Sequence, residues 1–246
     1  MLTLQNQNLT LCVDPFGAQM MELGSKQGTQ FLWNGDKQYW PDRAPVLFPY
    51  VARLTDGCYT LCGERYSMDI HGFAKDSVFT IEEQSSDSVT FCLRQTPETL
   101  RQYPFRFTFR VRYALRGWTV HVTYSVCNED EKELPFGIGG HPGFQIPIEK
   151  NLKFEDYRID FGEDSKPRRI LFSEDCFVLE EDEAFALEEG RYLNLEHNLF
   201  DDDAIVLKEM PREVTLESAK GSKKITVAFP DMDYLLMPQS KKGNCI

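Results

Sequence analysis

The chain has 246 residues, and four of them are histidines. Histidine is the only side chain whose unperturbed pKa lies close to neutrality. His121 alternates with threonines on the polar side of a predicted strand, and His197 lies in the polar loop 196–198, so both are interpreted as ordinary exposed residues. His71 and His141 have unusual surroundings. They are the candidates for hydrogen bonding and proton transfer.

Glycines surround one of these histidines. Residues 137–144 read G-I-G-G-H-P-G-F, and His71 lies in D-I-H-G-F-A-K-D just before a predicted strand. Glycine costs conformational entropy on folding, so four glycines in seven residues indicate close approach of backbone or ligand around His141. A loop with an ordinary, satisfied histidine accounts for the same composition about equally well.

Other chemistries lack their sequence signals. The pattern G-x-G-G-x-x-G is not followed by a helix, and neither a P-loop G-K-[ST] nor a G-x-S-x-G elbow is present. A phosphate cradle and a serine hydrolase are therefore excluded. Two separated histidines in an acidic, aromatic-rich β-protein suit proton transfer with a neutral polyol, with aromatic faces packing against a sugar ring.

Short strands must position these residues. Apolar residues occupy the odd positions of 105–113, and a second alternating run covers 118–126 after Arg116-Gly117, which predicts a hairpin. Further strands are predicted at 77–81, 89–93 and 225–229, and a turn of helix at 97–101 follows a Thr96 cap. The sequence predicts an all-β protein, a large antiparallel β-sandwich forming one domain over 1–246.

Composition restricts the partners and the compartment. The chain has 39 acidic and 27 basic residues and a net charge of −12, which disfavours nucleic acid and anionic membranes. No apolar run spans a membrane and no signal peptide is visible, so a cytoplasmic protein is expected. The seven cysteines are interpreted as reduced and inert thiols, because the Cys58/Cys62 pair lacks a second zinc-binding pair. The acidic runs 180–183 and 201–203 lack calcium-loop spacing, so no metal site is predicted.

A set of short motifs, in order along the whole chain, resembles the aldose 1-epimerase (galactose mutarotase-like) family, and in particular its shorter bacterial branch. The motifs are Gly17-Ala18, Leu32-Trp33-Asn34-Gly35-Asp36, Tyr39-Trp40, Pro45-Val46-Leu47-Phe48-Pro49, Arg53-Leu54, His71-Gly72-Phe73-Ala74, Gly140-His141-Pro142-Gly143-Phe144 and Leu199-Phe200 with Asp203-Ala204. Single pieces such as H-G-F are weak signals, whereas the ordered set is specific.

The resemblance implies a β-supersandwich that interconverts the α and β anomers of an aldose without a cofactor. It implies that His141 donates a proton to the ring oxygen and that His71 binds near that oxygen. It also implies that Arg53 and Asp203 contact sugar hydroxyls. Many relatives carry Arg where this chain has Lys75, and a point charge cannot reproduce the bidentate contacts of a guanidinium.

The C-terminal end departs from the family pattern. The resemblance implies a general-base glutamate in a C-[IL]-E-P-W segment, and this chain stops at Asn244-Cys245-Ile246, so we expect that glutamate beyond the given end. The alternatives are a non-catalytic sugar-binding or sugar-sensing protein on the same scaffold, and a glycosidase-accessory or lyase-like sandwich. A glycosidase would need two facing carboxylates, and no such pair is visible. Arg43, Arg53 and Lys75 are the candidate cations for a phosphosugar, but a neutral hexose is favoured, and the protein is expected to be a monomer or homodimer.

Overall fold

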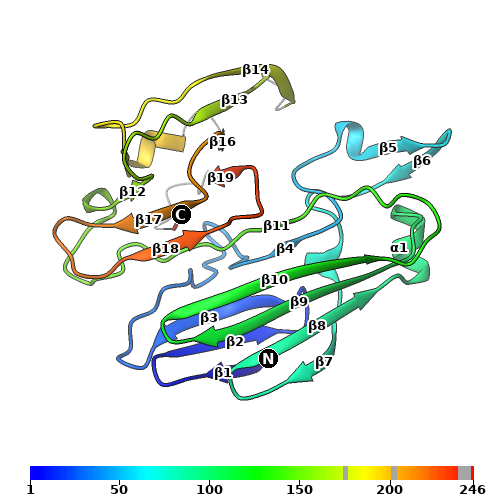
Figure 1. The fold of residues 1–246 in the computed structure, drawn as a ribbon, viewed down its shortest axis with the longest axis horizontal. Coiled ribbons are helices and arrows are strands. Elements are labelled where there is room, and N and C mark those ends of the chain that lie inside the picture. The colour runs from blue at the N-terminus through cyan, green and yellow to red at the C-terminus, as the bar shows by residue number, and fades with distance from the viewer. Residues whose placement is uncertain (174–176, 201–203, 238–244) are drawn as a thin grey trace. The chain divides into compact units, whose positions relative to one another are not determined.

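The chain divides into two compact units, both built almost entirely of strands. The computed structural model describes residues 1–173, 177–200, 204–237 and 245–246 (Figure 1). Unit 1 comprises residues 1–34 and 42–143, and unit 2 comprises residues 35–41 and 144–246. The single domain over 1–246 stays a prediction.

Unit 1 contains two antiparallel sheets that share one core. The first has the order β1-β2-β3 and the second the order β10-β9-β8-β7 (Figure 1). One cluster of buried side chains draws on both sheets, with Leu11 of β2 and Phe109 of β9 fully buried in it. The hydroxyl of Tyr113 on β9 donates a hydrogen bond of 2.7 Å to the carbonyl of Ala18. The predicted antiparallel sandwich is therefore confirmed. The strands are β1 (Leu2–Gln5), β2 (Leu9–Asp14), β3 (Gln19–Ser25), β7 (Thr80–Gln84), β8 (Ser88–Arg94), β9 (Phe107–Arg116) and β10 (Thr119–Asn128).

The hairpin β9–β10 follows directly from the alternating pattern. Its register pairs Thr119 with Arg116 at the turn and continues to Asn128 opposite Phe107. The apolar side chains predicted to face inward are buried on β9, where they face the first sheet across the core. On β10 this prediction holds less well, because Val120, Tyr124 and Val126 are half-buried and Val122 is 37% exposed. On the opposite face, Arg110 donates two hydrogen bonds, of 2.6 and 3.1 Å, to the Glu82 carboxylate of β7. The predicted cationic face is thus partly neutralised by edge strand β7, which lies beyond β8 in the sheet.

Some predicted strand ends were wrong. The strand expected at 77–81 begins instead at Thr80, because Ser77 closes a short 3-10 turn and its hydroxyl donates to the Phe73 carbonyl. Phe105 is buried but precedes β9, since its amide bonds to Tyr103. Trp118 was placed on the apolar face, yet it is 60% exposed because it lies in the turn after Gly117. The strands at 89–93 and 225–229 are confirmed as β8 and β18, within one residue.

Short elements complete unit 1. Strands β4 (Val46–Leu47) and β11 (Gly139–Gly140) form a two-stranded ladder, and β5 (Cys58–Leu61) pairs with β6 (Glu64–Ser67). The predicted helical turn is confirmed as α1 (Pro97–Gln102), whose Thr96 cap and Thr99 satisfy each other's backbone amides. Two 3-10 turns, η1 (Thr55–Gly57) and η2 (Ala74–Asp76), flank the β5–β6 hairpin in sequence.

Unit 2 consists of two further antiparallel sheets, with orders β15-β12-β17-β18 and β14-β13-β16-β19 (Figure 1). Three of the residues in the predicted solvated run 180–183 are exposed on edge strand β14, while Asp182 pairs with Arg168 and Lys208. Residues 201–203 lie outside the described residues. The elements are β12 (Arg158–Asp160), β13 (Arg168–Phe172), β14 (Val178–Ala184), β15 (Tyr192–Asn194), β16 (Ile205–Lys208), β17 (Glu213–Glu217), β18 (Ile225–Ala228), β19 (Leu235–Met237), η3 (Phe154–Asp156) and η4 (His197–Phe200).

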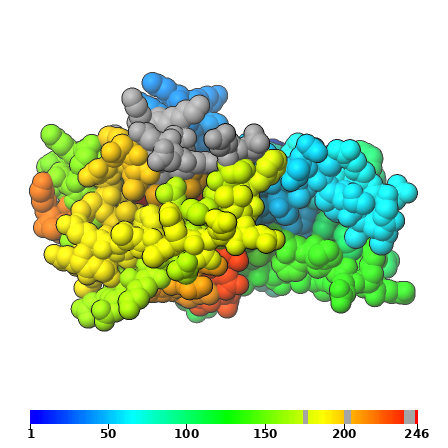
Figure 2. Space-filling model, turned by 90° about the horizontal axis from the view of Figure 1, so that it is seen from above, coloured from blue at the N-terminus to red at the C-terminus, as the bar shows by residue number. Residues whose placement is uncertain are grey.

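The β5–β6 hairpin carries the two cysteines considered as zinc ligands. It lies at the surface, in cyan in Figure 2, and Cys62 in its turn is exposed. Cys58 accepts a hydrogen bond from Arg65 at 2.9 Å. Among the described residues, no three His, Cys, Asp or Glu side chains gather as a metal site. None of the helices in the described ranges has the length and apolarity needed to cross a membrane.

Candidate functional site

The segment that carries His141 is held by backbone hydrogen bonds against residues 43–49. Gly137 donates to the Pro49 carbonyl at 2.7 Å, His141 to Pro45 at 3.1 Å and Gly143 to Arg43 at 2.8 Å. Between these bonds, β11 pairs with β4 in an antiparallel register. The main chain around His141 is therefore held by three hydrogen bonds to the segment 43–49. Within that segment only the two residues of β4 form regular strand pairs with β11.

One glycine beside His141 lies in close contact with an aromatic side chain. A Cβ added at Gly140 would lie 2.7 Å from the Tyr124 hydroxyl oxygen, closer than real contacts allow. The expectation of close approach around this histidine is therefore confirmed at Gly140. Tyr124, on β10, was not among the predicted site residues, because its position in the alternating pattern marks it only as an inward-facing aromatic. The missing side chain at Gly140 was the only signal for it.

His71 is held by an unusual exchange of hydrogen bonds with Ala52. The Ala52 amide donates to His71 Nδ1 at 3.0 Å, and the His71 amide donates to the Ala52 carbonyl at 2.9 Å. Both residues have left-handed backbones, with φ of 75° at Ala52 and 68° at His71. Non-glycine residues rarely adopt this conformation, so the surrounding contacts must hold the backbone in it at both residues.

Gly72 allows the His71 segment to lie directly against the core. Its φ is +72°, and an added Cβ would lie 2.4 Å from the Phe48 carbonyl oxygen. That same carbonyl accepts hydrogen bonds from the amides of Phe73 and Ala74, both at 3.1 Å. The H-G-F-A motif is thus fixed by its backbone to the fully buried Phe48.

The structure brings the two histidines together although 70 residues separate them in the chain. Their ring centroids lie 5.9 Å apart, with an edge-to-face angle of 75°. Burial, together with the charges of His141 and Lys75, lowers the pKa of His71 to about 4. Burial also lowers the pKa of His141, although its own backbone hydrogen bond and the Asp42 carboxylate partly offset this effect. Both rings are therefore held toward their neutral forms.

The predicted cations occupy different positions relative to this pair. Lys75 lies close enough for its charge to act on His71, but its ammonium is paired with Asp76 at 2.5 Å. Arg53 directly follows Ala52, is exposed, and forms no hydrogen bond or ion pair with any described residue. Arg43 donates to the Met21 carbonyl, which gives it a structural role. Asp203 lies outside the described residues, so its predicted contact with sugar hydroxyls stays a prediction.

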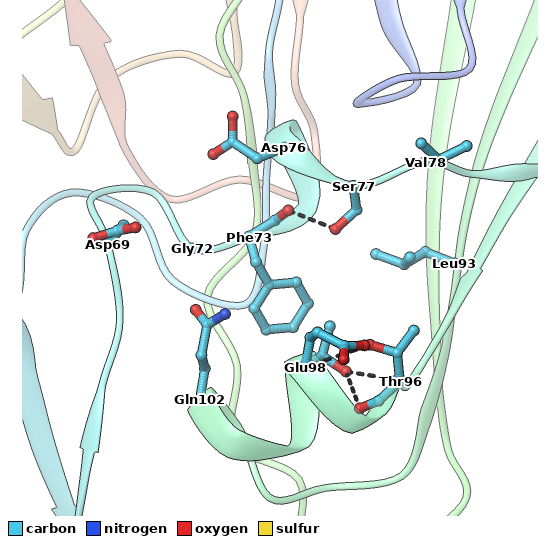
Figure 3. A pocket seen from close by; sticks show the side chains of 11 residues that line it. Asp69, Gly72, Phe73, Asp76, Ser77, Val78, Leu93, Thr96, Glu98 and Gln102 are labelled. Atoms are coloured by element: carbon cyan, nitrogen blue, oxygen red, sulfur yellow. Dashed lines mark hydrogen bonds between the residues drawn. The ribbon is translucent and has the colours of Figure 1, made fainter.

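A separate pocket of about 420 Å³ lies between η2 and α1 (Figure 3). The side chain of Phe73 points into it, with Glu98 and Gln102 of α1 nearby and Asp76 at the η2 side (Figure 3). Gly72 is also among its lining residues, but the described residues that line it include neither histidine. The pocket is next to the His71 segment in sequence, yet it is not the histidine site.

Comparison with known proteins identifies similar sequences along nearly the whole chain. The sequence model described as "Aldose 1-epimerase" matches residues 1–244. The chromosomal LacX protein of Lactococcus lactis subsp. lactis is 34% identical over 244 residues, which cover 96% of this chain and 82% of LacX.

Solved structures show the same fold. A galactose mutarotase-like protein from Lactobacillus casei ATCC 334 superposes with a TM-score of 0.91 at 31% identity, covering 99% of this chain and 84% of its own. A galactose mutarotase related enzyme from Lactobacillus acidophilus gives 0.85 at 28% identity, covering 96% and 83%. The predicted galactose mutarotase-like fold is thereby confirmed.

Proposed function

The chain belongs to the aldose 1-epimerase family, and from this premise we propose that it is a mutarotase that interconverts the α and β anomers of a hexose. The single observation that carries the proposal is the pair of histidines 5.9 Å apart in unit 1, each fixed through its backbone. Two groups that can donate a proton or a hydrogen bond at adjacent sugar oxygens are what ring opening of a pyranose requires.

In the proposed reaction, His141 protonates the ring oxygen while a base removes the proton from the C1 hydroxyl. The C1–O5 bond breaks and an open-chain aldehyde forms. Rotation about C1–C2 and reclosure with the proton transfers reversed give the other anomer. A histidine suits the acid role because its ordinary pKa lies near neutrality, and the Asp42 carboxylate acts against the burial that lowers the pKa of His141.

We propose a neutral hexose rather than a hexose phosphate as the substrate. A dianionic phosphate would need cations to overcome a chain charge of −12. Lys75 is already neutralised in part by Asp76, and Arg43 is engaged with the backbone, which leaves Arg53 of the three candidates. Arg53 then serves as a donor to sugar hydroxyls, the role that the family resemblance implies for it.

The experiment is polarimetry on freshly dissolved single anomers of several aldohexoses and of their 6-phosphates. The rate of approach to the equilibrium rotation should increase linearly with protein concentration, with free hexoses preferred. Saturable sugar binding without any acceleration would instead indicate a non-catalytic sugar-binding protein. Much higher kcat/KM for the 6-phosphates would contradict the preference for a neutral substrate.

A further inference from the structure

The contact between Ala52 and His71 determines which nitrogen of the His71 ring carries its proton. The Ala52 amide N–H points at Nδ1 at 3.0 Å, and an amide N–H can only donate. Nδ1 must therefore be the unprotonated acceptor, and the proton of the neutral ring must be on Nε2. The second bond of the exchange, from the His71 amide to the Ala52 carbonyl at 2.9 Å, fixes the backbone on which this contact depends.

Protonation of His71 would break this arrangement. An added proton at Nδ1 would face the Ala52 N–H directly, so a favourable hydrogen bond would be replaced by two opposed donors. The charged groups next to the ring act in the same direction, because Lys75 and a protonated His141 both repel an imidazolium at His71. Asp76 screens Lys75 through its 2.5 Å ion pair. His71 stays neutral at physiological pH.

We propose that Ala52 is a positioning residue, whose amide holds His71 as the Nε2–H tautomer and so presents a hydrogen-bond donor to the sugar oxygen that the family resemblance places near this histidine. The inference rests on the proposed mutarotase function and assigns different roles to the two histidines. His71 has no proton that it can release near neutral pH, so it stabilises developing charge on oxygen without proton transfer. His141 alone then carries the transferred proton.

The first test needs no sugar. Nitrogen-15 NMR of histidine-labelled protein at pH 7 should show His71 with an unprotonated Nδ1 and a protonated Nε2. The chain has only four histidines, so the His71 signals can be assigned from their absence in His71→Gln. A protonated Nδ1, or a titration near the ordinary pKa of about 6.5, would overturn the proposal.

The second test uses two amide side chains that mimic different halves of the ring. In His71→Gln the terminal amide can place an N–H donor near the position of Nε2. In His71→Asn the shorter side chain reaches only the position of Nδ1, where its oxygen can accept the hydrogen bond from the Ala52 amide. Asparagine also tolerates the left-handed backbone well. The Asn variant should lose about 10²–10³-fold in kcat, as when one transition-state donor is removed. The Gln variant should be at least about tenfold more active than the Asn variant.

Equal and complete loss in both folded variants would overturn the donor role. An Nε2–H tautomer in a wild-type protein that accelerates no anomer exchange would overturn the proposed function and the donor role, while leaving the positioning by Ala52 in place. The two failures are therefore distinguishable.

The positioning role is tested at Ala52, whose side chain is exposed. Ala52→Gly keeps the amide donor and relaxes the left-handed backbone, so the His71 pKa should remain far below 6.5. Ala52→Val strains the same backbone, because β-branched residues disfavour positive φ, and should displace the donor. The NMR titration of His71 should then shift upward from about 4 in the Val variant. An unchanged titration in folded Ala52→Val would contradict the assignment.

Discussion

The β9–β10 hairpin and the two histidine segments show opposite ways of using the backbone. The hairpin pairs ten residues on each strand without a break, and buried and half-buried positions alternate from Phe109 to Tyr113 of β9. The β4–β11 ladder pairs only two residues, and the His71 segment relies on left-handed residues and on two hydrogen bonds each with Phe48 and Ala52. Regular pairing supplies the core, whereas irregular backbone positions the groups that can do chemistry.

This comparison implies that the two regions should fail in different ways. Damage to the hairpin should reduce the free energy of unfolding and affect activity only through loss of folded protein. Damage to the histidine segments should reduce turnover in protein that remains folded. The predictions that follow separate these outcomes.

The largest effect is expected at His141. Replacing it in His141→Ala removes the proposed acid and should lower kcat by about 10²–10⁴-fold. The free energy of unfolding should change by less than about 1 kcal/mol, because the segment is held by backbone bonds that the substitution keeps. Anomer-exchange kinetics and urea unfolding of the same preparation measure both quantities. A folded variant with unchanged turnover would remove His141 from the mechanism.

The hairpin is tested by Phe109→Ala. Phe109 is fully buried, and its ring stacks on Phe48 with centroids 4.5 Å apart. Its truncation should lower the free energy of unfolding by about 3–5 kcal/mol. Thr123→Ala, on the exposed face of β10, is the control and should stay within about 0.5 kcal/mol. Chemical denaturation measures both, and a small effect at Phe109 would contradict a core shared by the two sheets.

Substitutions at two glycines distinguish the cost of a left-handed backbone from the cost of a steric clash. Gly63 and Gly72 both have positive φ, but an added Cβ meets nothing within 4 Å at Gly63 and lies 2.4 Å from the Phe48 oxygen at Gly72. Gly63→Ala should cost about 1–2 kcal/mol in the free energy of unfolding from the left-handed backbone alone. Gly72→Ala should cost about 1–3 kcal/mol more and also lower kcat, since it moves the His71 segment. Equal effects of the two substitutions would show that the close contact is unimportant.

The last prediction concerns the pH dependence of stability. His71 has a pKa of about 4 in the folded protein and 6.5 as the reference value, so the unfolded chain binds a proton first as the pH falls. The contribution of His71 to stability is therefore complete above about pH 6.5 and is lost between pH 6.5 and 4. Melting temperatures across this range should fall less steeply in His71→Gln than in the wild type. Parallel curves would mean that His71 titrates normally.

The sequence predicted the regular parts of the molecule better than the irregular ones. Alternation of apolar residues located β9 and β10, because a two-residue period is typical of a strand with one buried face, and β8 and β18 were located as short strands. It misplaced the ends of β7 and the burial of Trp118, where a 3-10 turn and a hairpin turn interrupt the period.

For the site, motifs located His71 and His141 but not what fixes them. Ala52 acts through its amide, and no side-chain pattern in a single sequence can report a backbone hydrogen bond. Tyr124 was not predicted as a site residue, because its place in the alternating pattern indicates only that it packs inward. The glycine next to it in space, Gly140, was the one sign of a close approach. The catalytic and binding roles of the predicted residues remain proposals.

The most direct test of the account is exchange NMR on a 1-¹³C-labelled hexose at anomeric equilibrium, with wild-type protein and His141→Ala compared at equal concentrations. The account predicts that the α-to-β exchange rate rises in proportion to wild-type protein and returns to the buffer rate with the variant. An exchange rate equal to that of buffer alone, in the presence of wild-type protein that demonstrably binds the sugar, would contradict it.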